Sequence, residues 1–345
     1  MGIKVRKSIS NLQTYNVGGR SDLSSDWECF DWNESEFPPT NKVFEVMKSF
    51  YRYERYPDIT AKQLKNKLSE YVSLPVDFIE VYNGSDDALK DIITVFVDKD
   101  TKVLSYQPSY TQVNTFITTN TEHYEKINIQ DPLGEHYFDF SYCKSADVVY
   151  LVNPNNPTGK LLPVKEIETL VKTYPNTLFI VDEAYYEFAK QSCTHLVVSH
   201  KNLIVTRTFS KAFGLASVRL GYCMAHPDTL SDVRKIRNGK AVNALGQLCG
   251  IAALDDLDYL QSRIDEMNDA KKFFIDNLPN YYHAIDSDAN FVLVKTPDSK
   301  KVLDKMKENK ILIRDRSAFD NLENCVRITI GSKKQIIRVL DVMTN

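Results

Sequence analysis

Lys211 is the residue of this chain whose surroundings in the sequence point most clearly to chemistry. It follows an apolar run at 203–205, typical of a short buried strand, and stands in a loop of small residues beside Ser210 and ahead of Arg219. A lysine amine held rigidly and partly desolvated in such a loop can attack a carbonyl carbon. A hydroxyl and a guanidinium close by could bind a phosphate group. A lysine that forms a Schiff base next to a phosphate-binding site is the requirement for the cofactor pyridoxal phosphate (PLP). Because most lysines are solvated surface residues, the rest of the chain has to supply the other parts of a PLP site.

Polar clusters also follow the other strands predicted before this loop. They lie at 83–87 after a strand at 78–82, at 108–110 after 102–105, at 153–159 after 147–152, and at 182–185 after 177–181. The strands are apolar without alternation, which indicates burial on both faces, as in a mostly parallel sheet. Because ligands bind outside the carboxyl ends of the strands in such sheets, we expect the clusters to form one site.

Two of these clusters have simpler interpretations that the residues alone leave open. Gly84 permits a tight turn, and Ser85 and Asp86 precede an apolar periodic stretch that predicts a helix. The free N–H groups and the positive dipole end of such a helix attract anions. Without further context, an ordinary helix cap at Ser85 or Asp86 is the simpler interpretation. Asp182 could likewise cap the helix that follows it.

The composition is that of a globular protein without a strongly charged partner. The 345 residues include 43 Lys and Arg against 46 Asp and Glu, a formal charge of -3, which argues against nucleic acid or an anionic membrane as a partner. No apolar run is long enough to span a bilayer, and the first residues lack the apolar core of a signal peptide. The six cysteines are scattered without a C-x-x-C pair, so we expect free thiols, no metal site and a cytoplasmic location.

The pattern changes near residue 237, which indicates a second domain. A long helical region runs from 245 towards 278, and short predicted strands follow at 291–294, 312–314 and 326–330. We therefore divide the chain into an N-terminal arm (1–30), a large PLP-binding domain (31–240) and a small C-terminal α+β domain (241–345).

Seven motifs spread along the chain carry a resemblance to a known family. They are RYPD at 55–58, NGSD at 83–86, PSY at 108–110, NPNNPTG at 153–159, VDEAYYEF at 181–188, SKAFGLASVRLG at 210–221 and VRITIG at 326–331. With these motifs in this order, the chain resembles fold-type I PLP-dependent aminotransferases, most closely the histidinol-phosphate aminotransferase family. The resemblance implies an α/β fold. Its large domain has a mostly parallel seven-stranded sheet sandwiched by helices, and a small α+β domain is attached.

The resemblance also assigns residues to the chemical groups of PLP. Lys211 corresponds to the lysine that forms an imine with the cofactor and, once released, moves a proton between the substrate Cα and the cofactor C4′. Asp182 corresponds to the anion that keeps the ring nitrogen protonated. The ring oxygen O3′ takes donors from Asn156 and Tyr185. The other cofactor contacts implied in this way are Tyr110 on the ring face, and Gly84, Ser85, Asp86, Ser210 and Arg219 around the phosphate.

Further residues correspond to a subunit contact and to substrate contacts. Tyr56 matches a residue that reaches the phosphate from the neighbouring subunit, which implies an obligate homodimer with shared active sites. Arg327 matches the arginine that binds the carboxylate of glutamate, a ligand that suits a planar guanidinium. In histidinol-phosphate enzymes the same arginine binds the substrate phosphate together with counterparts of Arg314 and Tyr15. The alternatives are a surface salt bridge for Arg314, and for Tyr15 an arm that is merely packed on the protein.

Two stretches depart from the pattern of the family. Near the N-terminus the family has an NENP-like run, whereas Asn33-Glu34 is followed here by Ser35-Glu36. A stretch of proline, an aromatic residue and asparagine normally lines the substrate pocket, and 239–243 reads GKAVN instead. The loss of a ring and the gain of a cation would change the shape and charge of the pocket.

The resemblance implies an amino-group exchange between glutamate/2-oxoglutarate and a small phosphorylated amine or carbonyl compound. Histidinol phosphate, a substrate of amino-acid biosynthesis, is the family default, and another phosphorylated ketone such as dihydroxyacetone phosphate (giving serinol phosphate) is the alternative that the departures suggest. A PLP-dependent decarboxylase of a phosphorylated amino acid is a second alternative. A non-enzymatic PLP-binding regulator would need an added DNA-binding segment, for which we expect no room before Tyr15 and no basic excess.

Overall fold

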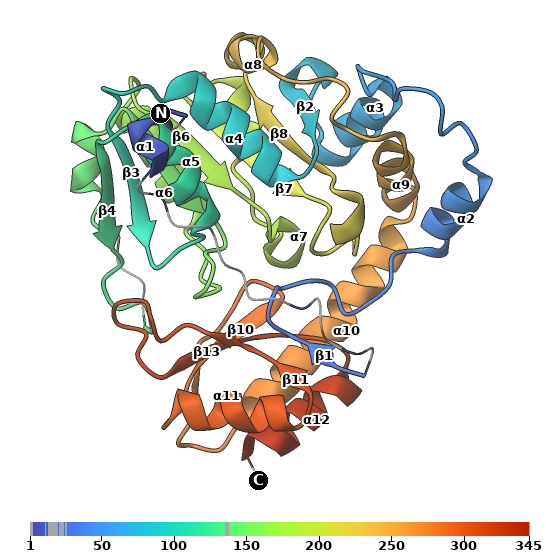
Figure 1. Cartoon of the computed structure of the whole chain (residues 1–345), viewed down its shortest axis with the longest axis vertical. Coiled ribbons are helices and arrows are strands. Elements are labelled where there is room, and N and C mark those ends of the chain that lie inside the picture. The colour runs from blue at the N-terminus through green and yellow to red at the C-terminus, as the bar shows by residue number, and fades with distance from the viewer. Residues whose placement is uncertain are drawn as a thin grey trace.

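A computed structural model of the chain describes residues 3–10, 12, 20, 24, 26–134 and 138–344. The predicted substrate residue Tyr15 lies outside the described residues. Figure 1 shows two parts, a large sheet with its helices and a smaller sheet with helices of its own. In the described part of the chain, no helix is both long enough and apolar enough to cross a membrane.

The large sheet has seven strands in the order β2-β8-β7-β6-β5-β3-β4. Their bounds are Ile79–Tyr82 (β2), Val103–Gln107 (β3), Tyr124–Asn128 (β4), Val148–Val152 (β5), Leu178–Asp182 (β6), Leu203–Thr208 (β7) and Gly221–Ala225 (β8). β8 is antiparallel to both of its neighbours, whereas β3, β4, β5, β6 and β7 pair in parallel. This confirms the predicted mostly parallel seven-stranded sheet.

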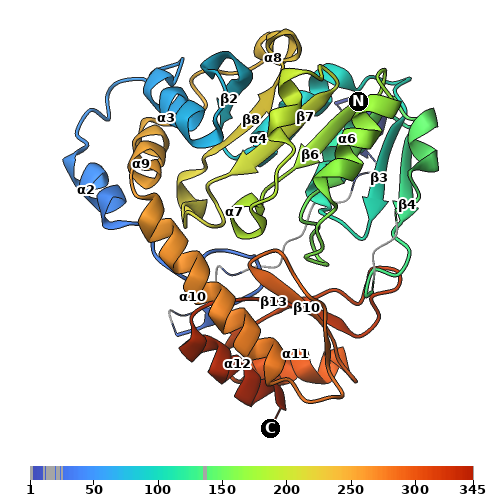
Figure 2. The same ribbon diagram turned by 180° about the vertical axis from the view of Figure 1, so that it is seen from behind.

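Helices cover both faces of the large sheet, as Figures 1 and 2 show from opposite sides. The helices of this part are Lys7–Ser10 (α1), Asn41–Ser49 (α2), Lys62–Val72 (α3), Ser85–Phe96 (α4), Gln112–Asn120 (α5), Val164–Thr173 (α6), Tyr186–Ala189 (α7), Pro227–Arg234 (α8) and Ala244–Leu254 (α9). Along β5, Val148 and Val152 share a core with α4, α5 and α8, whereas Val149 and Leu151 share the opposite core with α3, α6 and α9. Because both faces are buried, the strands read as unbroken apolar runs.

The small part contains a four-stranded antiparallel sheet in the order β12-β13-β10-β9. Its elements are Leu257–Asp276 (α10), His283–Ala284 (β9), Phe291–Lys295 (β10), Ser299–Glu308 (α11), Arg314–Asp315 (β12), Cys325–Thr329 (β13) and Lys333–Thr344 (α12). α10 runs from the large part to the small part (Figure 2). The N-terminal segment joins the small part, because β1 (Glu28–Cys29) pairs in parallel with β11 (Ile311–Leu312).

Some elements differ from those predicted. The helical region from 245 towards 278 is divided at Asp255 and Asp256 into α9 and α10, and the predicted strand 312–314 is divided between β11 and β12. β4 was not predicted, because its side chains are half-buried or exposed and form no apolar run. Since α9 packs against α2 and α3, it lies with the helices of the large sheet. The division of the chain at residue 240 stays a prediction.

Arg207 and Glu183 form a buried ion pair at the carboxyl ends of β6 and β7. The two side chains are only 2% and 1% exposed, with Arg207 Nη2 2.9 Å from Glu183 Oε2. Arg207 Nε also donates to this oxygen at 3.0 Å, and the ring of Tyr186 stacks 3.3 Å from the guanidinium carbon. The pair therefore fixes the residues directly beside Asp182 and ahead of the Lys211 loop.

Replacing Arg207 with methionine should lower the free energy of unfolding by about 3–5 kcal/mol, because the Glu183 carboxylate would stay buried without its cation. Urea-induced unfolding at neutral pH measures the change. The exposed pair between Lys201 and Asp228 provides the control, and Lys201→Met should cost less than about 1 kcal/mol. If the two variants lost equal free energy of unfolding, the buried pair would not be the more stabilising of the two pairs.

Candidate active site

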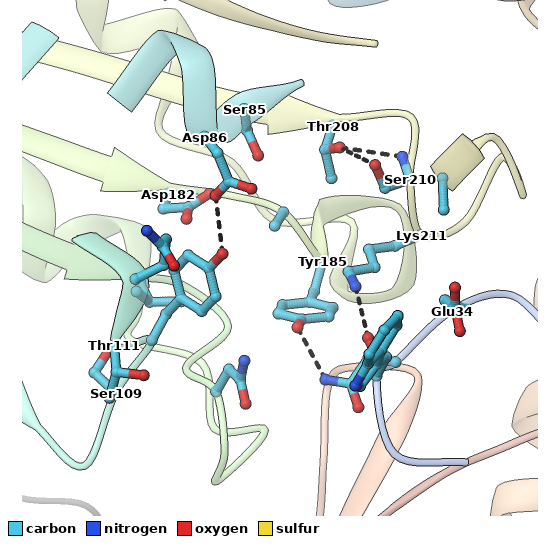
Figure 3. A pocket seen from close by; sticks show the side chains of 18 of the residues that line it. Glu34, Ser85, Asp86, Ser109, Thr111, Asp182, Tyr185, Thr208, Ser210 and Lys211 are labelled. Carbon is cyan, nitrogen blue, oxygen red and sulfur yellow. Dashed lines mark hydrogen bonds between the residues drawn. The ribbon is translucent and has the colours of Figure 1, made fainter. Parts of the chain in front are cut away.

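A cavity of about 640 Å³ lies at the carboxyl ends of the parallel strands, and residues of β12 and β13 line its other side. The residues predicted from the sequence that line it are Ser85, Asp86, Tyr110, Asn156, Asp182, Tyr185, Ser210, Lys211, Arg219, Arg314 and Arg327. The polar clusters that follow four different strands, together with the start of α4, therefore meet in one place (Figure 3).

Lys211 follows β7 and projects into this cavity. Its Nζ donates a hydrogen bond to the backbone oxygen of Trp32 at 2.9 Å, marked by a dashed line in Figure 3. Burial, assisted by the positive charge of Arg327, lowers the pKa of the Lys211 amine to about 8. A larger fraction of the amine is therefore neutral near pH 7 than in an ordinary lysine, and the neutral form is the nucleophile.

Asp182 is the last residue of β6 and is 4% exposed. Its Oδ2 accepts a hydrogen bond from the Tyr150 hydroxyl at 3.0 Å, and its Oδ1 accepts one from Thr206 Oγ1 at 3.1 Å. Burial raises the pKa of this carboxyl to about 6 although both hydrogen bonds oppose the rise, so the group is anionic at neutral pH. The interpretation of Asp182 as a helix cap is wrong, because Tyr185 occupies the N-cap position of α7.

The N-terminus of α4 and the Arg219 side chain form an anion-binding end of the cavity. Gly84 is the N-cap residue with φ +89°, and no side chain caps the helix, so the simple cap interpretation of Ser85 and Asp86 is wrong. A Cβ on Gly84 would lie 2.6 Å from Arg219 Nη2, so glycine is needed for this close approach. Arg219 Nη1 donates to Ser210 Oγ at 3.3 Å. Free helix N–H groups, a hydroxyl and a guanidinium together suit a phosphate.

The small sheet supplies the cationic side of the cavity. Arg327 is 3% exposed, and it donates from Nη1 to Asn156 Oδ1 and from Nη2 to the backbone oxygen of Asp31, both at 2.5 Å. Arg314 lies opposite Arg327 in the register of β12 and β13. Arg316, which the sequence analysis did not single out, lines the cavity with them. Arginines at this side suit an anionic substrate group.

The segment 31–34 is a part of the site that the sequence analysis missed. Asp31, Trp32, Asn33 and Glu34 all line the cavity. The Arg20 guanidinium forms ion pairs with Asp31 and Glu34 and stacks 4.0 Å from the Trp32 ring centroid. The match of Asn33 and Glu34 to the start of an NENP-like run was the signal that could have identified this segment.

Tyr56 does not line the cavity of its own chain. It is 78% exposed, with Lys240 Nζ 4.5 Å from its ring centroid. The divergent stretch 239–243 lies at the same place, since Gly239 is close to the backbone oxygen of Ile59 and Asn243 caps α9. None of the residues 239–243 lines the cavity of its own chain.

Comparison with known proteins agrees with this architecture. The profile of the family "Aminotransferase class I and II" matches residues 23–343. A dihydroxyacetone phosphate transaminase of Campylobacter jejuni is 37% identical over 90% of this chain and 88% of its own length, and a histidinol-phosphate aminotransferase of Geotalea daltonii is 29% identical over 98% of both. The crystal structure of histidinol-phosphate aminotransferase from Sinorhizobium meliloti in complex with pyridoxal-5′-phosphate superposes with a TM-score of 0.84 at 25% identity, over 92% of this chain and 89% of that chain. This chain belongs to the aminotransferase class I and II family.

Proposed function

We propose that this protein uses PLP to transfer an amino group between glutamate and a small phosphorylated ketone. The observation that carries the proposal is the position of the Lys211 amine and the buried Asp182 carboxylate in one cavity. The donor set fits the cofactor, because an anion-binding helix end, a hydroxyl and a guanidinium lie at the same cavity. When bound, PLP supplies a carbonyl that amines attack and a conjugated ring that accepts electrons.

The chain's own groups divide the work in this proposal. Ser85, Ser210 and Arg219 hold the phosphate, and Asp182 holds the proton on the ring nitrogen. Tyr110 covers the ring, with its hydroxyl anchored by a 2.9 Å hydrogen bond to Asp86. Lys211, with its lowered pKa, would take the proton from the substrate Cα and deliver it to C4′ of the cofactor.

The substrate of both half-reactions is expected to be anionic, because three arginines line the cavity: Arg314, Arg316 and Arg327. Arg327 would bind the carboxylate of glutamate, and with Arg314 it would bind the phosphate of the second substrate. Among the substrates named for the relatives, we favour dihydroxyacetone phosphate, because the Campylobacter jejuni transaminase is the more similar of the two relatives described above. Two alternatives are to be tested against dihydroxyacetone phosphate. One is histidinol phosphate as the substrate, and the other is decarboxylation of a phosphorylated amino acid.

The test is a screen of the second half-reaction. Purified protein loaded with PLP is converted to its amine form with glutamate, and phosphorylated ketones are then added singly. Recovery of the original absorbance spectrum with dihydroxyacetone phosphate is the expected result. Recovery with imidazole acetol phosphate alone would favour the histidinol-phosphate assignment. Release of carbon dioxide without any need for a keto acid would overturn transamination.

We also infer a homodimer in a reducing, cytoplasmic environment. Several large apolar side chains close to Tyr56 in the sequence are exposed, and they are Phe44, Met47, Tyr51, Tyr53 and Ile59. A second copy of the chain would cover this surface and could receive Tyr56 at its own cavity. All six cysteines are free thiols, which supports a reducing compartment. Analytical sedimentation at micromolar concentration tests this inference, and a result that shows monomers alone would exclude the dimer.

The capture of PLP by the cofactor-free protein should depend on pH through Lys211. For an amine with a pKa of about 8, the rate of capture should rise about 50-fold between pH 6 and pH 8 and then level off. The rise follows the neutral fraction of the amine, which is the reactive form. Stopped-flow absorbance measures the rate. A rate that keeps rising to pH 10 would show an unshifted lysine instead.

A further inference from the structure

Asn33 connects the two parts of the molecule at the edge of the cavity. It is 1% exposed and adopts the left-handed conformation with φ +55°. Asparagine is among the few residues that tolerate this conformation. Its backbone N–H donates to Thr329 Oγ1 at 3.1 Å. The single proton of that hydroxyl lies between the backbone oxygen of Phe30 at 2.9 Å and Asn33 Oδ1 at 3.3 Å. β13 of the small sheet therefore anchors the Asn33 backbone beside its amide.

The other end of this amide faces Tyr185. Asn33 Nδ2 donates to the Tyr185 hydroxyl oxygen at 2.9 Å (Figure 3). The Tyr185 ring is 4% exposed and packs edge-on against Phe291 with 5.1 Å between centroids, so the phenol has little freedom to move. A phenol oxygen that accepts a hydrogen bond still has its own proton to donate. Because Tyr185 lines the cavity, that proton can be directed into it.

The electrostatic environment keeps this proton on Tyr185. Burial raises the pKa of the Tyr185 hydroxyl, while the charge of Arg327 and the hydrogen bond from Asn33 lower it. The phenol is therefore a neutral donor at physiological pH, and the Asn33 bond is one of the contacts that tune its strength.

We propose that Asn33 is a positioning residue that directs the Tyr185 proton into the cavity, towards the ring oxygen of the bound cofactor. The proposal rests on the proposed function, since it needs PLP in the cavity. A donor at the ring oxygen stabilises the anionic form of that oxygen, so it lowers the pKa at which the chromophore of the loaded protein titrates. Without Asn33, the Tyr185 hydroxyl loses the contact that determines its direction.

The test is a spectroscopic pH titration of the PLP-loaded protein. Asn33→Gly keeps the left-handed backbone and removes the amide, whereas Asn33→Asp places a carboxylate there that accepts the Tyr185 proton. Each variant should raise the pKa of the chromophore by about 1 unit, compared with about 1–2 units for Tyr185→Phe. In the Tyr185→Phe background, Asn33→Gly should add less than about 0.3 units, because the effect runs through Tyr185.

Asn290 provides the matched control. Its Nδ2 donates to the backbone oxygens of Asn33 and Glu34 at 3.2 and 3.4 Å, so it anchors the same segment through hydrogen bonds that do not involve the Tyr185 hydroxyl. Asn290→Ala should leave the chromophore pKa within about 0.2 units of the wild-type value. A shift as large as that of Asn33→Gly would overturn the proposal, because anchoring of the segment would then explain both.

The outcomes separate this proposal from the proposed function. Wild-type protein that takes up no PLP would defeat the proposed function itself. Wild-type protein that takes up PLP, with an unchanged chromophore pKa in both Asn33 variants, would defeat the role of Asn33 alone. Thermal unfolding of the cofactor-free variants shows whether they are folded. If Asn33→Gly is unfolded, Asn33→Asp, which is nearly isosteric with asparagine, decides the question.

Discussion

Lys211→Ala should lower the rate of transamination by about 10⁴-fold, the upper range for loss of a positioned acid-base group. The variant loses both the amine that binds the cofactor carbonyl and the base that moves the substrate proton. No other lysine lines the cavity within the described part of the chain. Steady-state turnover with glutamate and the acceptor found in the half-reaction screen measures the loss.

Covalent attachment gives an independent measurement on the same variant. After PLP loading and borohydride reduction, mass spectrometry should find the cofactor on the peptide that contains residue 211 of the wild-type protein, and no cofactor in Lys211→Ala. Lys190→Ala is the control, because Lys190 follows α7 and bonds to Gln261 on the surface. Its turnover should match that of the wild type. Activity of Lys211→Ala within tenfold of wild type would refute the assignment.

Asp182→Asn should lower the turnover number by about 10²–10³-fold, the usual cost of removing one preorganised electrostatic contact. Asparagine keeps the shape, and its single amide oxygen can accept one of the two hydrogen bonds that Tyr150 and Thr206 donate to Asp182, but it carries no charge. The loss should therefore appear in the turnover number at saturating PLP more than in the folding of the protein. Rates with PLP in excess and far-UV circular dichroism measure the two effects.

Another carboxylate at the cavity, that of Asp86, is the control for Asp182. Asp86 is partly exposed and bonds to the Tyr110 hydroxyl, so Asp86→Asn should cost less than about tenfold in turnover. In the cofactor-free protein, the affinity for PLP should also fall as the pH drops through about 6, where Asp182 takes up a proton and loses the charge that would pair with the ring nitrogen. An Asp182→Asn variant as active as Asp86→Asn would contradict the proposed contact with the ring nitrogen.

Much of the site could be predicted because its chemistry is local in the sequence. Asp182 ends a buried strand, and Lys211 and Asn156 lie in the loops that follow buried strands. Parallel strands bring such positions to one edge of a sheet. The helix end at Gly84 was also visible, since a glycine before an apolar periodic stretch indicates a turn into a helix. What could not be predicted was whether the polar residues at these ends were caps or ligands, because a cap has the same sequence pattern.

The sequence alone determined the cofactor class, the α/β fold and the strand-end residues, because each depends on a short stretch of chain and on the rule that parallel strands share a carboxyl edge. Only the tertiary structure decided how Asn33, Thr329 and Tyr185 meet, since 296 residues separate Asn33 from Thr329 and 152 separate it from Tyr185. The tertiary structure alone also decided that Arg316 lines the cavity and that Tyr56 lies outside the cavity of its own chain. A hydrogen bond between distant residues leaves no periodicity in the sequence, because its partner is chosen by the packing of the two sheets and not by the neighbours of either residue.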